Sequence, residues 1–343
     1  MKLTALIMAG GKGERFYPAS RNKLPKQFLS LTSDHETMIQ KTIKRISPLV
    51  DIKDTYILTN KMYKDLVHEQ LPDLPLENII LEPVARNTAP AIELGIEKLK
   101  QKEKDAVVIV LPSDHLIKDE NEFRNVISKG ATFASSNDAL ITIGIKPTEP
   151  NTGYGYIHLG EKNEHLYKVD KFVEKPNLEK AKEYLNEGMY VWNAGMFIFT
   201  IKNIDKAFKT YMKNQYDILS KDISKFEYVE SVSIDYGIME KANNIYVIPG
   251  DFGWDDVGSW LALERINGTD NNGNTILNKD VEIYQTKGTT IKGDNDKLII
   301  TLGVDNLIVV ESDDVILVAN KDKINDIKQV IADIKNKKLD KYI

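Results

Sequence analysis

The sequence predicts an α/β protein, with a Rossmann-like, mostly parallel, doubly wound sheet followed by a small β domain and a terminal helix. Short apolar runs alternate with stretches of helical periodicity from residue 3 to about residue 139, which is typical of a parallel sheet. The run AVVIVL at 106–111 suits a central strand covered on both faces. Residues 275–319 are rich in Ile, Val and Thr with frequent Gly and Asp, as in short strands.

The elements of the larger domain follow in chain order. A buried strand ends at Ala9, and further strands are expected at 55–59, 78–81 and 106–111, with intervening helices near 39–46 and at 61–70 and 88–104. Thr88 is a candidate N-cap of the last of these helices. Beyond residue 139 we expect strands at 140–145, 154–159, 167–174, 191–200 and 246–249 and helices at 178–186, 201–219 and 234–241.

The best domain boundary is the Gly/Asn/Asp cluster NGTDNNGN at 267–274, because such residues favour turns. It predicts a larger domain over 1–266, which is expected to hold the functional site, and a small β domain with a terminal helix over 267–343. Asn320 or Asp322 is expected to cap that amphipathic helix.

Composition narrows the class of protein. The net charge is −5, which argues against nucleic acid or a membrane surface as partner of the whole molecule. The chain has no cysteine, so disulfides, zinc–thiolate sites and cysteine nucleophiles are excluded. It has no apolar run long enough to span a membrane. A soluble cytoplasmic protein is the simplest expectation.

A glycine-rich turn directly follows the first strand. Glycines let backbone N–H groups approach an anion, and Lys12, Arg15 and Lys26 add positive charge. The turn is therefore expected to bind phosphates. The dinucleotide pattern places Phe16 where its third glycine belongs, which argues against a nicotinamide-dependent dehydrogenase. The P-loop pattern requires a hydroxyl after the lysine, where this chain has Gly13.

Two other polar segments follow predicted strands, at 82–87 and 112–115. Ligands of doubly wound sheets bind outside the carboxyl ends of the strands, so we expect these segments and the glycine-rich turn at one crevice. Asp114 would be a natural magnesium ligand there, although a lone Asp after a strand is more often a turn cap.

The stretch GGKGERFYPASRNKLPKQF at 10–28 resembles the opening motif of the sugar-phosphate nucleotidyltransferases, and in particular of the mannose-1-phosphate guanylyltransferases. Further motifs of that family follow in its order, at 82–90, 111–115, 151–156, 172–176, 192–197, 233–240 and 253–260. The resemblance implies transfer of GMP from GTP to α-D-mannose 1-phosphate, giving GDP-mannose and pyrophosphate with Mg²⁺ as cofactor. It thus implies a role in GDP-mannose biosynthesis.

The resemblance also implies roles for charged residues. Lys12, Arg15 and Lys26 would stabilise the triphosphate and the departing pyrophosphate, and Lys175 would hold the attacking sugar phosphate. Asp114 and Asp256 would bind the metal, with the neighbouring Asp255 as an alternative to Asp256.

The remaining predicted site residues form two sets. Glu82 could accept two hydrogen bonds from the N1–H and N2–H₂ edge of guanine, which would discriminate strongly between bases. The nucleotide set comprises Ala9, Gly10, Gly11, Gly13, Glu82, Arg86, Asn87 and Ser113. The sugar set comprises Gly153, Glu174, Asn193 and Asp235, of which Asp235 is equally plausible as a helix N-cap.

Two other functions remain open. The first is a related enzyme that uses another sugar 1-phosphate or another base. The second is a non-catalytic regulatory subunit that binds sugar nucleotides, although such a protein could lose its loop cations and aspartates without losing binding. A homodimer formed through the C-terminal region is a further hypothesis.

Overall fold

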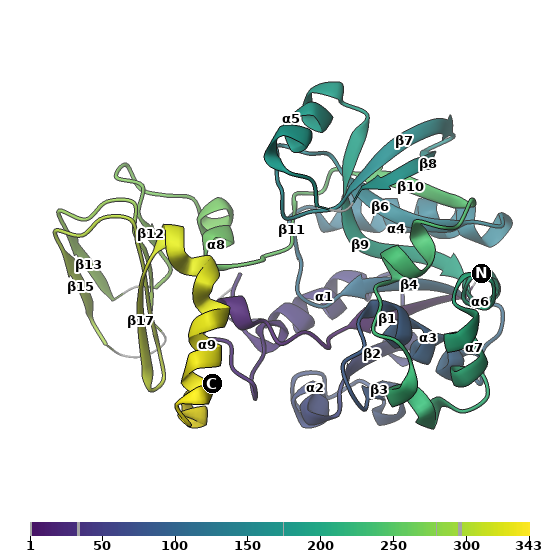
Figure 1. Ribbon diagram of the computed structural model, residues 1–343, viewed down its shortest axis with the longest axis horizontal. Helices are drawn as coiled ribbons and strands as arrows, with labels where there is room; N and C mark the ends of the chain where they lie inside the picture. Colours follow the sequence, from purple (N-terminus) through teal and green to yellow (C-terminus); the bar gives the residue numbers. More distant parts are fainter. Residues whose placement is uncertain (1, 33–34, 174, 279, 294–296) are drawn as a thin grey trace. The chain divides into compact units, whose positions relative to one another are not determined.

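The computed structural model describes residues 2–32, 35–173, 175–278, 280–293 and 297–343 (Figure 1). The chain forms two compact units. The first unit contains the described residues up to Gly10 together with 42–113 and 117–254, and the second contains 11–41, 114–116 and 255–343. The predicted boundary at residue 267 falls inside the second unit. The glycine-rich turn from Gly11 onward groups with the C-terminal residues.

The first unit is built on a nine-stranded sheet with the order β3-β2-β1-β4-β9-β6-β10-β8-β7. Its parallel half consists of β1 (Leu3–Met8), β2 (Thr55–Asn60), β3 (Ile79–Glu82) and β4 (Val107–Pro112). This half has the strand order 3-2-1-4 of a dinucleotide-binding half-sheet. It therefore confirms the predicted Rossmann-like α/β class.

The other half of the sheet is mixed. It contains β6 (Leu140–Ile145), β7 (Tyr156–Asn163), β8 (Leu166–Val173), β9 (Tyr190–Thr200) and β10 (Ile245–Gly250). Strand β9 runs antiparallel to both β4 and β6, whereas β10 is parallel to β6. The sequence pattern does not reveal this reversal, because a buried strand has the same apolar run in either direction.

Helices connect these strands. They are α1 (Met38–Ile46), α2 (Lys64–Gln70), α3 (Thr88–Leu99), α4 (Glu120–Ser136), α5 (Leu178–Glu187), α6 (Ile201–Tyr211) and α7 (Lys213–Leu219). Short 3-10 turns lie at 52–54, 61–63, 76–78 and 223–228, and η7 (Asp235–Met239) is a single π-helical turn. Among the described residues, no helix is both long and apolar enough to cross a membrane.

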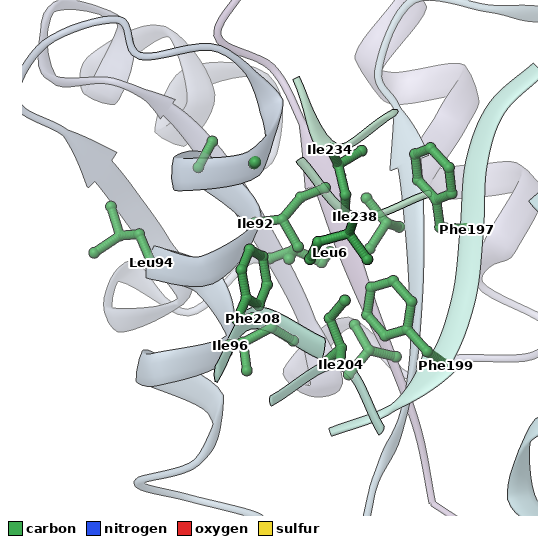
Figure 2. Close-up of a cluster of buried hydrophobic side chains, with 14 of the residues drawn as sticks. Leu6, Ile92, Leu94, Ile96, Phe197, Phe199, Ile204, Phe208, Ile234 and Ile238 are labelled. Carbon is green, nitrogen blue, oxygen red and sulfur yellow. The ribbon is translucent and has the colours of Figure 1, made fainter. Parts of the chain in front are cut away.

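The core of the first unit lies between the sheet and helices α3 and α6. Figure 2 shows Leu6 of β1, Ile92 and Ile96 of α3, and Phe208 of α6 meeting in one cluster. Nearly every residue of α3 is buried, including the acidic residues Glu93 and Glu97. Its Gly95 permits the close packing, since a β carbon there would lie 2.7 Å from a methyl of Leu6.

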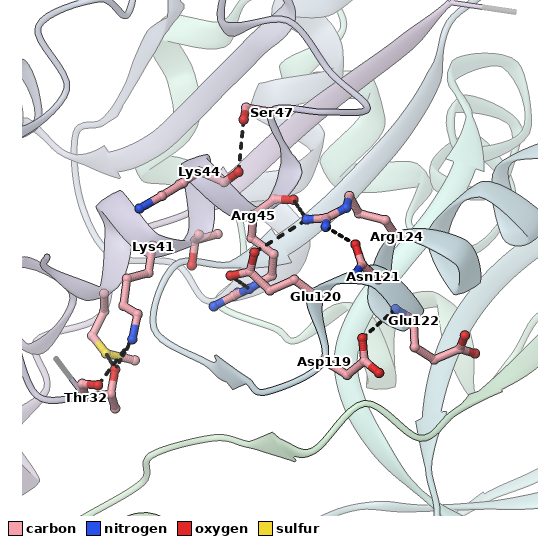
Figure 3. A network of polar contacts seen from close by, with 12 residues as sticks. Thr32, Lys41, Lys44, Arg45, Ser47, Asp119, Glu120, Asn121, Glu122 and Arg124 are labelled. Carbon is pink, nitrogen blue, oxygen red and sulfur yellow. Dashed lines mark hydrogen bonds and ion pairs between the residues drawn. The ribbon is translucent and has the colours of Figure 1, made fainter.

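A polar network joins the end of α1 to the start of α4 (Figure 3). Arg124 donates hydrogen bonds to the carbonyl of Arg45, at 3.0 Å, and to Asn121 Oδ1, at 2.6 Å. The Arg45 guanidinium lies 3.7 Å from Glu120. Burial lowers the pKa of Arg45 to about 10, and Glu120 opposes that shift. Arg45 therefore stays charged at neutral pH.

The second unit contains short strands, as predicted. They are β12 (Thr275–Ile276), β13 (Val281–Tyr284), β14 (Thr290–Lys292), β15 (Ile299–Leu302), β16 (Leu307–Ser312) and β17 (Val315–Asn320). Strands β12, β14 and β16 are parallel to one another, as are β13 and β15, and β17 closes antiparallel on β16. Strands β5 (Leu116–Ile117) and β11 (Trp254–Asp255) lie where the chain passes between units.

The helices of the second unit pack on the glycine-rich turn. They are α8 (Trp260–Asn267), α9 (Ile327–Asn336) and the 3-10 turns η1 (Glu14–Phe16), η2 (Lys26–Phe28), η8 (Lys321–Asp326) and η9 (Asp340–Tyr342). Asn320 caps η8 by accepting from the Asp322 N–H, so the predicted cap begins a 3-10 turn, and α9 starts after it at Ile327. Phe16 is fully buried with its ring centroid 5.2 Å from that of Trp260. This packing explains why Phe16 replaces a glycine.

Candidate active site

The glycine-rich turn of the second unit is held by side chains that follow it. Gly13 has a φ of 63°, and a β carbon there would lie 2.3 Å from Lys26 Cβ, so only glycine fits. Ser20 Oγ donates to the Gly13 carbonyl at 2.6 Å, and Gln27 Nε2 donates to the Gly11 carbonyl at 3.0 Å. The motif from Ser20 to Gln27 thus serves to shape the turn.

A pocket of about 350 Å³ opens beside this turn. It is lined by Lys12, Gly13, Glu14, Arg15, Phe16, Lys26, Asp114, His115, Asp256, Gly258 and Lys328. All of these residues belong to the second unit. The pocket brings together all three predicted loop cations and both predicted metal ligands, which come from segments far apart in the chain.

Lys26 occupies the centre of the polar contacts in this pocket. Its buried ammonium lies 2.9 Å from Asp114 Oδ2 and donates to the Asp256 carbonyl at 2.8 Å. Burial alone would raise the pKa of Asp114, but the charges of Lys26 and His115 and the Lys26 hydrogen bond outweigh it. The pKa of Asp114 is therefore below its ordinary value, and its side chain is a carboxylate at neutral pH.

Asp255 and Asp256 have different surroundings in the structure. Asp255 forms an ion pair with Arg265, at 3.0 Å, and accepts a hydrogen bond from the Val257 N–H, at 2.8 Å. Asp256 instead lines the pocket. Gly258 leaves room for its carboxylate, since a β carbon at that position would lie 2.8 Å from Asp256 Oδ2.

Asp114 and Asp256 offer a pair of carboxylates in one pocket. Oxygen ligands suit hard divalent cations, and magnesium in phosphate-transfer sites is commonly held by one or two carboxylates together with substrate phosphates. The described residues contain no group of three or more His, Cys, Asp or Glu placed to hold a metal. The two aspartates fit the predicted kind of site.

The predicted residues at the strand ends of the first unit are fixed by backbone hydrogen bonds. The Ala9 N–H donates to the Leu58 carbonyl, and the Ala9 carbonyl accepts from Thr59 Oγ1 at 2.8 Å. The Ser113 N–H donates to the Met8 carbonyl at 3.1 Å. Ala9 and Ser113 are both buried. The bonds of Ala9 join the ends of β1 and β2, and the bond of Ser113 joins the ends of β1 and β4, as expected at the carboxyl edge of the sheet.

Glu82 lies against Gly10 in the first unit. A β carbon on Gly10 would lie 2.8 Å from Glu82 Oε1, so any larger residue there would displace the Glu82 carboxyl group. Glu82 is buried, and burial raises its pKa to about 7. A desolvated carboxyl group at a strand end is suited to pairing with hydrogen-bond donors of a ligand.

Asn87 and Arg86 have local partners in the first unit. Asn87 has a φ of 67° and caps α3 by accepting from the Thr88 N–H at 2.8 Å, so the predicted cap at Thr88 is wrong by one residue. The Thr88 hydroxyl instead accepts from the Ile234 N–H. Arg86 Nη2 donates to the Glu227 carbonyl at 2.5 Å. Positive φ at a non-glycine residue is often found at functional sites.

Two of the predicted sugar-site residues meet in the first unit. Asn193 Nδ2, from β9, donates to Asp235 Oδ1 at 2.8 Å. Asn193 Oδ1 accepts from the Thr142 hydroxyl and from the Gly195 N–H. Asp235 begins the π-helical turn η7, a feature that often marks functional sites.

The other sugar-site residues lie elsewhere in the first unit. The Gly153 N–H donates to Asn151 Oδ1 at 2.7 Å in the turn before β7, and Lys175 is exposed. Glu174 lies outside the described residues.

Sequence reasoning did not identify several residues of the pocket. Gly258 lines the pocket and leaves room for the Asp256 carboxylate, whereas Ser20 and Gln27 support the turn without lining the pocket. All three lie within the motifs at 10–28 and 253–260, which were the available signal. His115 follows Asp114 directly and lines the same pocket. Lys328 comes from the terminal helix, and the sequence carries no signal for it, because its lysine-rich turns look like a solvated face.

The chain is similar to known proteins over most of its length. Residues 4–273 match the nucleotidyl transferase family, and residues 279–334 match the MannoseP isomerase/GMP-like β-helix domain. The chain is 40% identical to a mannose-1-phosphate guanylyltransferase of Salmonella montevideo, with 97% of this chain and 74% of that protein covered. The chain is 38% identical to a mannose-1-phosphate guanylyltransferase of Escherichia coli K12, again with 97% of this chain and 74% of that protein covered.

A solved structure is similar over the whole chain. The crystal structure described as mannose-1-phosphate geranyltransferase from Thermus thermophilus has 33% identity and a TM-score of 0.89, and the match covers 98% of this chain and 100% of that one. The order of the motifs and the fold agree with these likenesses. The chain therefore belongs to the nucleotidyl transferase family and, within it, to the mannose-1-phosphate guanylyltransferases.

Proposed function

We propose that this protein transfers GMP from GTP to α-D-mannose 1-phosphate, producing GDP-mannose and pyrophosphate. The observation that carries the proposal is the pocket that Lys12, Arg15 and Lys26 line together with Asp114 and Asp256. Cations suit a triphosphate, and paired carboxylates suit its metal ion. The names of the relatives supply the base and the sugar.

The reaction is a direct displacement at the α-phosphorus. An oxygen of the sugar phosphate forms a new bond to that phosphorus while the bond to the bridging oxygen of the leaving pyrophosphate breaks. No covalent enzyme intermediate is needed. Lys12 and Arg15 would stabilise the charge that accumulates on the pyrophosphate, so catalysis rests on positioning and charge stabilisation.

Family members typically need a divalent metal ion, and we take this ion to be Mg²⁺. Asp114 and Asp256 would hold it, and its charge when bound would offset that of the phosphates. Lys26 already balances Asp114, at 2.9 Å. It would keep that carboxylate ionised and oriented before the metal arrives.

The substrates would be recognised by the residues of the first unit. Glu82 as a carboxylate would accept from the N1–H and N2–H₂ groups of guanine, and Gly10 would leave the space that its side chain requires. Asn193 and Asp235, which bond to each other at 2.8 Å, would together bind sugar hydroxyls. Lys175 would neutralise the attacking phosphate.

The decisive assay is release of pyrophosphate by the purified protein. It should be run with mannose 1-phosphate and glucose 1-phosphate, each with GTP, ATP, UTP and dTTP, with and without Mg²⁺. We expect turnover with mannose 1-phosphate and GTP that requires the metal. Turnover with another pair would identify a related enzyme. Binding of GDP-mannose without turnover of any pair would identify a regulatory subunit and overturn the proposal.

We also propose that the protein forms a homodimer through its C-terminal strands. Ile316 and Val318 of β17 are 68% and 61% exposed. They alternate along the strand and so lie on one face of it. Apolar side chains this exposed on a sheet commonly pack against a partner. A location in the cytoplasm stays the prediction made from the sequence.

A further inference from the structure

We propose that Lys328, on the terminal helix α9, is a fourth cation of the pocket beside the glycine-rich turn, here called the phosphate pocket. It contacts the β- and γ-phosphates of GTP and the pyrophosphate that they become. This inference rests on the proposed function. It assigns the site a residue from the C-terminal end of the chain, outside the motifs of the first 260 residues. The pocket wall includes Lys328 together with Lys12, Arg15 and Lys26.

The helix is anchored so that Lys328 stays at this wall. Ile327 and Ile331 are one helical turn apart and pack in one buried cluster with Tyr17 and Ile343. Helix α9 also contacts η1, the turn that carries Arg15. Residues at i and i+4 share a helix face, so Ile327 and Ile331 bury one stripe. Lys328, next along the helix from Ile327, is held at its edge.

The charges around the pocket are unbalanced. Lys26 is paired with Asp114. Lys12, Arg15 and Lys328 form no ion pair or side-chain hydrogen bond with the part of the chain that the structure describes. Glu14 and Asp256 also line the pocket, so its four cations face three carboxylates. This excess of positive charge, together with three cations that have no partner of their own among the described residues, favours a ligand with several negative charges. Pyrophosphate has that chemistry, and so has the end of a nucleoside triphosphate.

The same helix contains a matched control. Lys335 is an exposed lysine of α9 that does not line the pocket. Exchanging it for alanine changes the net charge and the helix propensity as the Lys328 exchange does. Any effect confined to Lys328 therefore reports its position rather than the loss of one positive charge from the molecule.

The test compares Lys328→Ala, Lys328→Arg and Lys335→Ala with the wild type in the full chain. Binding of inorganic pyrophosphate is measured by titration calorimetry in the presence of Mg²⁺, at low and at high salt. Steady-state constants are measured for GTP and for mannose 1-phosphate. We expect Lys328→Ala to weaken pyrophosphate binding about tenfold, the size of one charge-assisted contact. Lys328→Arg should largely restore it.

Further readouts separate contact from a structural effect. Lys328→Ala should raise the KM for GTP while leaving the KM for mannose 1-phosphate and the melting temperature unchanged. Its pyrophosphate affinity should also fall less with added salt than that of the wild type, because one screened charge is missing. If Lys328→Ala lowers the melting temperature, Lys328→Arg and Lys328→Met are compared instead, because both keep the length of the side chain. Weaker pyrophosphate binding by Lys328→Met than by Lys328→Arg supports the contact, and equal binding contradicts it.

The outcomes distinguish this inference from the proposed function. If the wild type is active and Lys328→Ala binds pyrophosphate as tightly as Lys335→Ala does, the inference is wrong and the function stands. If the wild type transfers no GMP but its pyrophosphate binding depends on Lys328, the phosphate contact stands and the function fails.

Discussion

The ammonium of Lys26 lies 2.9 Å from Asp114 Oδ2 and also donates a hydrogen bond to the carbonyl of Asp256. One lysine thus joins the phosphate turn to both aspartates of the candidate metal site. Only 6% of the Lys26 side chain is exposed, against 32% for Asp114. A lysine so buried needs its partner, so the pair is part of the fold as well as of the site.

Replacing Asp114 with asparagine should remove metal-dependent turnover while leaving a folded protein. Asparagine keeps the shape and one acceptor for Lys26 but loses the charge that a divalent cation requires. We expect kcat to fall by a hundredfold or more, roughly the loss seen when one strong charge-stabilising group is removed. The measurement is pyrophosphate release over a magnesium titration, together with circular dichroism to check the fold.

The matched variant is Asp255→Asn. Asp255 pairs with Arg265 instead of lining the pocket, so this change should alter stability more than magnesium dependence. The metal assignment fails if Asp114→Asn retains wild-type activity. It also fails if Asp255→Asn loses the turnover that requires magnesium while Asp256→Asn retains that turnover.

Glu82 should make guanine recognition depend on pH. Burial raises its pKa to about 7, so its carboxylate form increases as the pH rises through 7. Because only the carboxylate accepts both guanine donors, the KM for GTP should fall roughly tenfold between about pH 6 and about pH 8. Glu82→Gln should abolish this dependence and weaken the preference for GTP over ATP.

The same group affects stability with a defined sign. The pKa of Glu82 in the folded protein lies above its ordinary value of 4.5. The contribution of Glu82 to the free energy of unfolding is therefore greatest below pH 4.5, and it is lost as the pH rises from 4.5 toward 7. Glu82→Gln should therefore be more stable than the wild type above pH 7, by about 1–3 kcal/mol. An unchanged GTP preference and pH profile in this variant would show that another residue reads the base.

Gly13→Ala should destabilise the second unit, whereas Gly11→Ala should not. Gly13 has a positive φ and a β carbon there would strike Lys26, while a β carbon on Gly11 meets nothing within 4 Å. We expect a loss of about 2–4 kcal/mol for Gly13→Ala and under about 1 kcal/mol for Gly11→Ala. Urea unfolding measures both. Equal effects would show that Lys26 does not restrict the turn.

Dimerisation through β17 should be sensitive to charge. Lysine at Ile316 or Val318 would place an ammonium group in an apolar contact, so Ile316→Lys and Val318→Lys should shift the protein toward the monomer. Light scattering after size-exclusion chromatography gives the mass. Leu76→Lys is the control, since Leu76 is a 52% exposed apolar residue of the first unit. A wild type that is monomeric at micromolar concentration would contradict the dimer.

The local sequence predicted most of the parallel half of the sheet and the glycine-rich turn after β1. Strand β4 is an unbroken apolar run, and the glycines and cations after β1 have few roles besides anion binding. These features are local, because they depend on burial and on backbone freedom within a few residues. The direction of β9, the cap at Asn87 instead of Thr88 and the parallel pairing of β12 with β14 are not local, since they depend on which strands become neighbours.

The order of residues along the chain sets which chemical groups are available, namely the loop cations, the two aspartates, Glu82 and the β-rich C-terminal region. Their grouping comes from the folded arrangement. Asp255 and Asp256 are adjacent in the chain, yet one pairs with Arg265 and the other lines the phosphate pocket. Lys328 reaches that pocket because Ile327 and Ile331 bury one face of α9. Packing across hundreds of residues sets these placements, and no motif of a few residues encodes it.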